Sequence, residues 1–241
     1  MLKPYFETEL GKLYHGDCLE IMPHLEPVDL VLTDPPYGVT AAEWDNRINI
    51  NNIIQDNDLV IVTAIPPFSS VLIYENLSKY KYSWIWAKNR ATGFPLSKFR
   101  PLRNYEEILV FSYNTPPYSP QKTKGHVPTN SAKGCSQGTI YHGENIRNYN
   151  GGSTERYPLQ IQFFKCERGY HETQKPVALM KYMIQTYNAK SICDPFLGSG
   201  TTAVACERLN RRWIGIEIEE KYCEIAAKRI YNDTRQLRLF N

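Results

Sequence analysis

A run with the composition of a nucleotide-binding turn lies late in the chain. It reads Asp194-Pro195-Phe196-Leu197-Gly198-Ser199-Gly200-Thr201-Thr202, between a predicted strand and a predicted helix. Gly198 and Gly200 allow a tight turn and a close approach of the backbone to a ligand, and the amino end of the next helix offers free N–H groups. Because many strand-to-helix turns contain glycine, this run needs a second feature before it indicates a site.

Glu217 supplies that feature. It lies 23 residues after Asp194, at the end of the next predicted strand, where a carboxylate can accept hydrogen bonds from both hydroxyls of a ribose. The dinucleotide fingerprint G-x-G-x-x-G would require glycine where Ala203 stands, and no Walker lysine follows Gly200. The pattern therefore predicts a nucleotide-like ligand and fits a nicotinamide-dependent oxidoreductase poorly.

Another run, Thr33-Asp34-Pro35-Pro36-Tyr37-Gly38, also follows a predicted strand. Each of its residue types suits a turn, so the run taken alone is compatible with a turn that has no chemical role. Two further short motifs are Gly16-Asp17, upstream of this run, and Gln174-Lys175-Pro176, at the start of a predicted helix. The meaning of these runs depends on their combination and their order.

Together, these motifs resemble those of the amino-methylating DNA methyltransferases. The glycine run with Gly215-Ile216-Glu217 is similar to their S-adenosylmethionine site, the Asp-Pro-Pro-Tyr run to their catalytic motif, and Gln174-Lys175-Pro176 to the start of the helix before the cofactor strand. Gly16-Asp17 resembles their acidic contact to the cofactor's adenine ring. The catalytic motif comes first and the glycine turn last, an order that resembles the β group, a circular permutation of the more familiar arrangement.

The resemblance implies a role for each matching residue. The implied catalytic residues are Asp34, Pro35, Pro36 and Tyr37, and the implied cofactor-binding residues are Asp17, Lys175, Asp194, Phe196, Gly198, Ser199, Gly200, Thr201 and Glu217. The implied cofactor is S-adenosylmethionine, and the implied substrate is duplex DNA.

The Asp-Pro-Pro-Tyr motif suits methylation of an exocyclic amine, whose lone pair is delocalised into the base. Asp34 can accept one amino hydrogen bond, and the rigid Pro-Pro segment can hold the Pro35 carbonyl as a second acceptor. Tyr37 can stack on a base rotated out of the duplex, which partly offsets an unstacking cost of about a few kcal/mol. In the family, Asp at this position is typical of adenine N6 enzymes and Ser of cytosine N4 enzymes, so Asp34 favours adenine.

Several alternatives stay open beside adenine methylation. Cytosine N4 needs the same two acceptors, and related Asn-Pro-Pro-Tyr enzymes methylate RNA or protein glutamine. A catalytically silent DNA-binding module is a further alternative, although the intact Asp34, Tyr37, Gly198, Gly200 and Glu217 argue against it. Cytosine C5 chemistry is disfavoured because the catalytic motif contains no cysteine.

The elements that must position these residues alternate between short apolar runs and helical patterns. Strands are predicted over 28–33, 59–63, 82–87, 107–113, 191–194 and 213–217, and helices over 68–80, 176–187, 201–209 and 219–231. This alternation predicts one α/β domain over 1–241, a doubly wound, mostly parallel sheet of the Rossmann-like, circularly permuted methyltransferase type.

A basic insertion is predicted at 88–170, where the pattern becomes irregular from Asn114 onwards. It contains twelve Lys and Arg against five Asp and Glu, a charge of +7, which leaves −4 for the rest of the chain. Cations interleaved with aromatic residues suit a phosphate backbone, although a solvated loop can also be basic. The candidates for DNA contact are Arg90, Lys98, Arg100, Arg103, Lys122, Lys124 and Arg147.

Composition bounds the remaining possibilities. The chain has 241 residues, 42% of them hydrophobic and 22% charged, so a folded protein is expected rather than a disordered one. No apolar run approaches the roughly 20 residues of a membrane span, and no export signal is recognised, so we expect a cytoplasmic protein. The six cysteines lack a C-x-x-C pair, which disfavours zinc and predicts reduced thiols.

The last residues predict a partner. Gln236-Leu237-Arg238-Leu239-Phe240 resembles the peptide with which bacterial replication and repair proteins dock on the sliding clamp. Its three apolar side chains could equally pack on this protein or on a second copy of it. The methyltransferases that these motifs resemble are commonly dimers, so the resemblance also predicts a homodimer.

Overall fold

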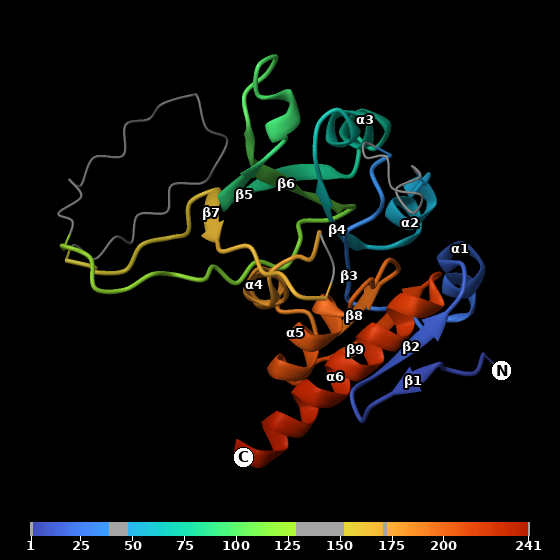
Figure 1. The fold of residues 1–241 in the computed structure, drawn as a ribbon. Coiled ribbons are helices and arrows are strands. Elements are labelled where there is room, and N and C mark those ends of the chain that lie inside the picture. Colours follow the sequence, from blue (N-terminus) through green and yellow to red (C-terminus); the bar gives the residue numbers. More distant parts are fainter. Residues whose placement is uncertain (1, 39–47, 129–151, 171–172, 241) are drawn as a thin grey trace. The chain divides into compact units, whose positions relative to one another are not determined.

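Nine strands form one sheet in the residues that the computed structural model describes, which are 2–38, 48–128, 152–170 and 173–240 (Figure 1). Their order across the sheet is β1-β2-β9-β8-β3-β4-β6-β5-β7. The strands are β1 (Phe6–Glu7), β2 (Gly11–His15), β3 (Leu30–Thr33), β4 (Leu59–Ala64), β5 (Tyr80–Thr92), β6 (Arg103–Ser112), β7 (Ile161–Phe164), β8 (Ser191–Asp194) and β9 (Arg212–Glu217). The helices are α1 (Cys18–Ile21), α2 (Asn51–Asp56), α3 (Phe68–Glu75), α4 (Val177–Thr186), α5 (Thr201–Leu209) and α6 (Glu220–Phe240), with 3-10 turns η1 (Met22–His24) and η2 (Phe94–Leu96).

Helices cover both faces of the sheet, which confirms the predicted doubly wound fold. The five neighbouring strands β2, β9, β8, β3 and β4 are parallel, and β6 is antiparallel to both β4 and β5. Every side chain of β3, β4 and β8 is buried, as expected for strands covered on both sides. Leu30 and Leu32 pack with α4 and α5 on one face, whereas Val31 packs with α2 and α3 on the other.

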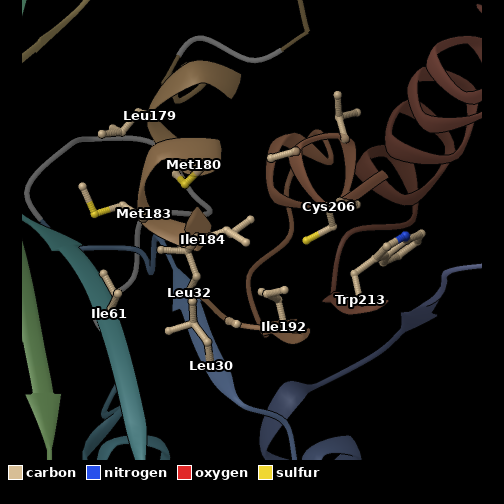
Figure 2. Packing of buried hydrophobic residues seen from close by; sticks show 14 of the residues in the cluster. Leu30, Leu32, Ile61, Leu179, Met180, Met183, Ile184, Ile192, Cys206 and Trp213 are labelled. Atoms are coloured by element: carbon tan, nitrogen blue, oxygen red, sulfur yellow. The ribbon is translucent and has the colours of Figure 1, made fainter. Parts of the chain in front are cut away.

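The packing under α4 shows how this arrangement is held. Met183 and Ile184 project from the helix towards Leu32 and Ile61 of the sheet (Figure 2). All four side chains are fully buried, and burying a side chain of this kind contributes roughly 1.5–3 kcal/mol. The helix therefore anchors the chain directly after Gln174-Lys175-Pro176.

The carboxyl ends of the five parallel strands lie at one edge of the sheet. After β3 the chain continues to β4 on one side, whereas after β8 it continues to β9 on the other. The winding therefore reverses between β3 and β8, and this switch point is where open α/β sheets bind ligands. The Asp-Pro-Pro-Tyr run follows β3 and the glycine run follows β8, so the topology brings the two motifs together.

Several element boundaries differ from those predicted. α3 ends at Glu75 instead of Tyr80, because the Asn76 side chain donates to the Leu72 carbonyl at 3.0 Å and the chain then turns into β5. β5 runs on to Thr92, and α6 continues to Phe240, nine residues past its predicted end at Tyr231. β1, β2, α1, α2 and β7 were not predicted.

The predicted insertion at 88–170 is divided between two compact units. Residues 1–119 with 160–241 form one unit, and residues 120–159 form the other. Strands β5, β6 and β7 therefore belong to the first unit. In the second unit, Thr123 pairs with Arg156 in an isolated bridge, and Lys122 lies 3.3 Å from Glu155.

Candidate active site

A pocket of about 710 Å³ opens at the carboxyl ends of the parallel strands, and all its lining residues belong to the first unit. It brings together every predicted catalytic and cofactor residue except Gly200, namely Asp17, Asp34, Pro35, Pro36, Tyr37, Lys175, Asp194, Phe196, Gly198, Ser199, Thr201 and Glu217. Among the predicted DNA contacts, Arg90, Arg100 and Arg103 line the pocket and Lys98 does not. Lys122 and Lys124 lie in the second unit, and Arg147 lies outside the described residues.

The two glycines of the turn after β8 have different environments. Both have a positive φ, +54° at Gly198 and +82° at Gly200. A Cβ added at Gly198 would meet no described atom within 4 Å, whereas one added at Gly200 would lie 3.1 Å from the Ala226 Cβ of α6. Gly198 therefore leaves open space at the pocket, and Gly200 allows close packing of the turn against α6.

The Glu217 carboxylate holds the glycine turn by hydrogen bonds to the backbone. Its Oε2 accepts a hydrogen bond from the Gly198 N–H at 2.7 Å, and its Oε1 accepts one from the Glu219 N–H at 2.9 Å. Burial raises the pKa of this carboxyl group. The side chain lines the pocket and orients the backbone of the glycine turn.

Asp194 joins the two strands at the switch point. Its carboxylate accepts hydrogen bonds from the Thr33 hydroxyl at 2.9 Å, the Thr202 hydroxyl at 2.6 Å and the Phe196 N–H at 3.1 Å. Burial raises the pKa of Asp194 to about 6. Since its partners come from β3, α5 and the glycine turn, this side chain ties the end of β3, directly before Asp34, to the glycine turn.

Replacing Asp194 by asparagine is expected to change how stability depends on pH. The folded pKa of about 6 lies above the ordinary value of 3.8, so the folded state binds the proton more tightly, and this stabilisation is lost as pH rises from about 4 to about 6. Its size is at most roughly 3 kcal/mol. Urea unfolding of both proteins at several pH values measures it. Parallel pH profiles for the Asp194→Asn variant and the parent would contradict the expectation.

Both carboxylate oxygens of Asp34 have partners within the protein. The Tyr37 and Thr63 hydroxyls donate hydrogen bonds to Oδ1, and the Lys175 ammonium donates to Oδ2. The Tyr37 ring packs against Phe68 with 5.4 Å between ring centroids. Burial and the nearby Asp34 carboxylate raise the pKa of the Tyr37 hydroxyl, so it stays protonated and acts as the donor.

Lys175 lies between two carboxylates. Its side chain is 5% exposed, and its ammonium pairs with Asp34 and lies 3.4 Å from Glu106 Oε2. Burial alone would lower the pKa of Lys175, but Asp34 and Glu106 raise it, so the ammonium stays charged. Lys88 pairs with the other oxygen of Glu106. The predicted cofactor residue Lys175 therefore contacts Asp34 of the predicted catalytic motif directly.

Sequence reasoning missed four residues that hold this site. Thr63 and Glu106 touch the Asp34 cluster, and Lys88 pairs with Glu106. Arg229 of α6 donates to the Ser199 carbonyl at 3.1 Å and to the Thr201 hydroxyl at 2.9 Å, behind the glycine turn. An arginine on a mostly polar helix and a glutamate on a strand both resemble solvent-facing residues, so the sequence carried no clear signal for either.

Other features of the described part of the chain bear on the predicted exclusions. Within it, no group of three His, Cys, Asp or Glu side chains could hold a metal ion, and none of the helices has the length and hydrophobicity of a membrane span. Its five cysteines are free, and four of them are buried, whereas Cys166 is half-buried at the pocket wall. Cys135 lies outside the described residues.

Comparisons with known proteins agree on one family. Residues 68–228 match the family model of the N6/N4 DNA methylases. The chain is 26% identical to the type II methyltransferase M.BamHI of Bacillus amyloliquefaciens over 99% of this chain and 61% of that protein. It is 25% identical to M2.MboI of Moraxella bovis, over 98% and 94% of the two chains.

Solved structures have the same fold. The M1.HpyAVI–SAM complex superposes with a TM-score of 0.61 and 25% identity, over 91% of this chain and all of that one. The cytosine-N4-specific PvuII DNA methyltransferase superposes with a TM-score of 0.65 and 16% identity, over 97% and 94% of the two chains. These structures support the predicted Rossmann-like methyltransferase fold.

Proposed function

Because this chain belongs to the N6/N4 DNA methylase family, we propose that it transfers a methyl group from S-adenosylmethionine to the N6 amine of adenine in duplex DNA. The observation that carries the proposal is made at the switch point, where the glycine turn and the Asp34 loop, which is the run Asp34-Pro35-Pro36-Tyr37, line one pocket. The runner-up substrate is the N4 amine of cytosine, which the same two acceptors could bind.

The pocket has the features that S-adenosylmethionine requires. Its volume of about 710 Å³ suits a ligand of this size. Carboxylates of Asp17 and Glu217 provide acceptors for the nucleoside part, and the open space at Gly198 leaves room beside the backbone. When bound, the cofactor supplies a methyl group activated by its sulfonium.

The residues of the catalytic loop would orient the target amine. Asp34 accepts one amino hydrogen bond and the Pro35 carbonyl accepts the other, which directs the nitrogen lone pair towards the methyl group. The Tyr37 ring stacks on a base that has left the duplex. Asp34 at the first position of the motif supports adenine as the base.

Glu217→Ala is expected to weaken S-adenosylmethionine binding by about 10- to 100-fold, since a hydrogen bond to a charged group contributes about 1.5–3 kcal/mol. The loss has two sources, because the variant removes the ribose acceptor and also the partner of the Gly198 N–H. Isothermal titration calorimetry measures the affinity. Glu220→Ala, which removes an exposed carboxylate nearby, is the matched control and should bind normally.

The proposed DNA surface includes the outer half of the β5–β6 hairpin. Residues 89–105 carry Arg90, Lys98, Arg100 and Arg103 and no carboxylate, and the three arginines line the pocket. The hairpin tip also exposes Phe94 and Phe99. This combination of cations and aromatic rings suits a phosphate backbone with bases within reach.

Arg100→Ala is expected to weaken DNA binding uniformly across sequences and to reduce the salt dependence by about one counterion, if Arg100 contacts a phosphate. Fluorescence anisotropy at several salt concentrations measures the slope of log K against log [salt]. Lys228→Ala on α6, which removes a cation that is 77% exposed, should leave the slope unchanged. A normal slope for Arg100→Ala would exclude this residue from the DNA surface.

The proposed reaction is tested by identifying its product. Purified protein is incubated with S-adenosylmethionine and mixed-sequence DNA, which is then digested to nucleosides for mass spectrometry. N6-methyladenine supports the proposal. N4-methylcytosine would change the proposed substrate to the N4 amine of cytosine. Cofactor binding without a methylated base would favour RNA, protein or a catalytically silent DNA-binding module.

Two partner predictions complete the proposal. Docking of Gln236–Phe240 on a sliding clamp predicts that deleting this segment abolishes clamp pull-down without lowering the melting temperature. The backbone of these residues continues α6, so docking in an extended form requires the end of this helix to unwind. The second prediction is a homodimer. Light scattering measures the mass of the protein in solution, which should be twice that of one chain.

A further inference from the structure

Four charged side chains alternate in sign along one wall of the pocket. Lys88 of β5 pairs with Glu106 of β6, Glu106 lies beside Lys175, and Lys175 pairs with Asp34. Exposure of the side chains is 9% for Lys88, 11% for Glu106, 5% for Lys175 and 24% for Asp34. The cluster is therefore largely withdrawn from water, and each charge depends on its neighbours.

This cluster conflicts with the proposed role of Asp34. Oδ2 of Asp34 accepts from the Lys175 ammonium, and Oδ1 accepts from Tyr37 and Thr63. A target amine that donates to Asp34 must compete with these donors. In addition, an ammonium paired with Asp34 neutralises the carboxylate that should favour the positive charge developing on the amine. The observed arrangement therefore needs a change before the amine can bind productively.

Glu106 offers Lys175 an alternative partner. Its Oε1 is held by Lys88, whereas its buried Oε2 accepts no hydrogen bond from any described residue and lies 3.4 Å from the Lys175 ammonium. The ammonium attracts this oxygen across 3.4 Å but donates no hydrogen bond to it, so a closer contact would stabilise the pair. A short movement of the flexible lysine side chain would satisfy this oxygen and release Oδ2 of Asp34.

We propose that Glu106 is a positioning residue that takes over the Lys175 ammonium when the target amine reaches Asp34. Lys88 keeps the Glu106 carboxylate in place during this exchange. Lys175 then neutralises Glu106 instead of Asp34, so the full negative charge of Asp34 faces the amine. This inference rests on the proposed methyl transfer, and it adds a charge exchange that controls when Asp34 becomes an acceptor.

Glu106→Gln tests the exchange, because the amide keeps the shape of the side chain but has no charge to hold the ammonium. We expect the single-turnover methylation rate at saturating S-adenosylmethionine to fall at least tenfold, while cofactor affinity stays the same. The double variant Glu106→Gln/Lys175→Met should be at least threefold faster than Glu106→Gln, because it removes the ammonium that would otherwise stay on Asp34. Glu107→Gln, on the same strand, is the matched control.

The recovery in the double variant separates positioning from a merely structural role. A lower rate for Glu106→Gln without recovery in the double variant would overturn the inference, as would a parent-like rate for Glu106→Gln. If Glu106→Gln lowers the melting temperature, Glu106→Asp replaces it as the test. Aspartate keeps the charge but has a shorter side chain, which moves the carboxylate away from Lys175. A parent-like rate for Glu106→Asp would equally overturn the inference. A parent protein that methylates no base would instead reject the proposed function.

Discussion

Replacing Asp34 by alanine should reduce the methylation rate by about 10²- to 10⁴-fold and leave S-adenosylmethionine affinity unchanged, because one acceptor for the amine is lost while the glycine turn is intact. The variant should fold, because the partners of Asp34 retain another contact. The Lys175 ammonium still lies 3.4 Å from Glu106, and the Tyr37 hydroxyl still lies 3.1 Å from the Thr63 hydroxyl. A radioactive methyl-transfer assay, together with calorimetry of cofactor binding, measures the two effects separately.

Two further variants make the Asp34 test specific. Asp34→Asn keeps the shape but has one acceptor oxygen and no charge, so we also expect a large loss of rate. Asp58→Ala, which removes an exposed carboxylate from the turn before β4, should retain the parent rate. An Asp34→Ala protein with full activity would remove Asp34 from the catalytic mechanism.

Gly200→Ala should destabilise the protein and impair cofactor binding together. A left-handed backbone costs a residue with a Cβ about 1–2 kcal/mol, and Gly200 has φ +82°. The added Cβ would also lie 3.1 Å from the Ala226 Cβ and 3.3 Å from its Cα, and such overpacking costs about 1–3 kcal/mol. We expect the glycine turn to shift away from α6, which would disturb the hydrogen bond between the Gly198 N–H and Glu217. Urea unfolding measures the free energy.

Gly198→Ala is the matched control for this prediction. It shares the left-handed conformation, with φ +54°, but its Cβ would meet no described atom within 4 Å. We expect only the backbone cost of about 1–2 kcal/mol, with a loss of cofactor affinity because the Cβ occupies space at the pocket. Equal destabilisation of the two variants would show that the contact with α6 contributes nothing.

Most of the predicted site residues met in one pocket because Asp17, the Asp-Pro-Pro-Tyr run, the glycine turn and Glu217 all lie at the carboxyl ends of parallel strands, whereas Lys175 comes from the start of α4. The strands at the centre of the sheet were predictable, since Leu30–Thr33 and Leu59–Ala64 are short, largely apolar runs bounded by turn residues. The pairing of β3 with β8, which the structure shows, then places the Asp-Pro-Pro-Tyr run beside the glycine turn. Periodicity and motif spacing were sufficient for these elements.

Long-range contacts limited the prediction elsewhere. Gly11 weakens the pattern of β2, yet a Cβ there would lie 2.3 Å from the Trp213 carbonyl, so packing between strands determines the residue. Glu106 resembles a solvent-facing strand residue, and its partners Lys88 and Lys175 come from separate parts of the chain. α3 was predicted too long because apolar residues continue at helical spacing past Asn76, whose side-chain hydrogen bond ends the helix.

The burial of most thiols makes the protein suitable for chemical labelling. Cys18, Cys193, Cys206 and Cys223 are buried, and burial raises the pKa of each of these thiols, which slows their reaction with alkylating reagents. Cys166 is half-buried at the pocket wall. A maleimide fluorophore coupled to Cys166, in a protein with Cys135 replaced by serine, would report the binding of small molecules in the pocket by a change in emission.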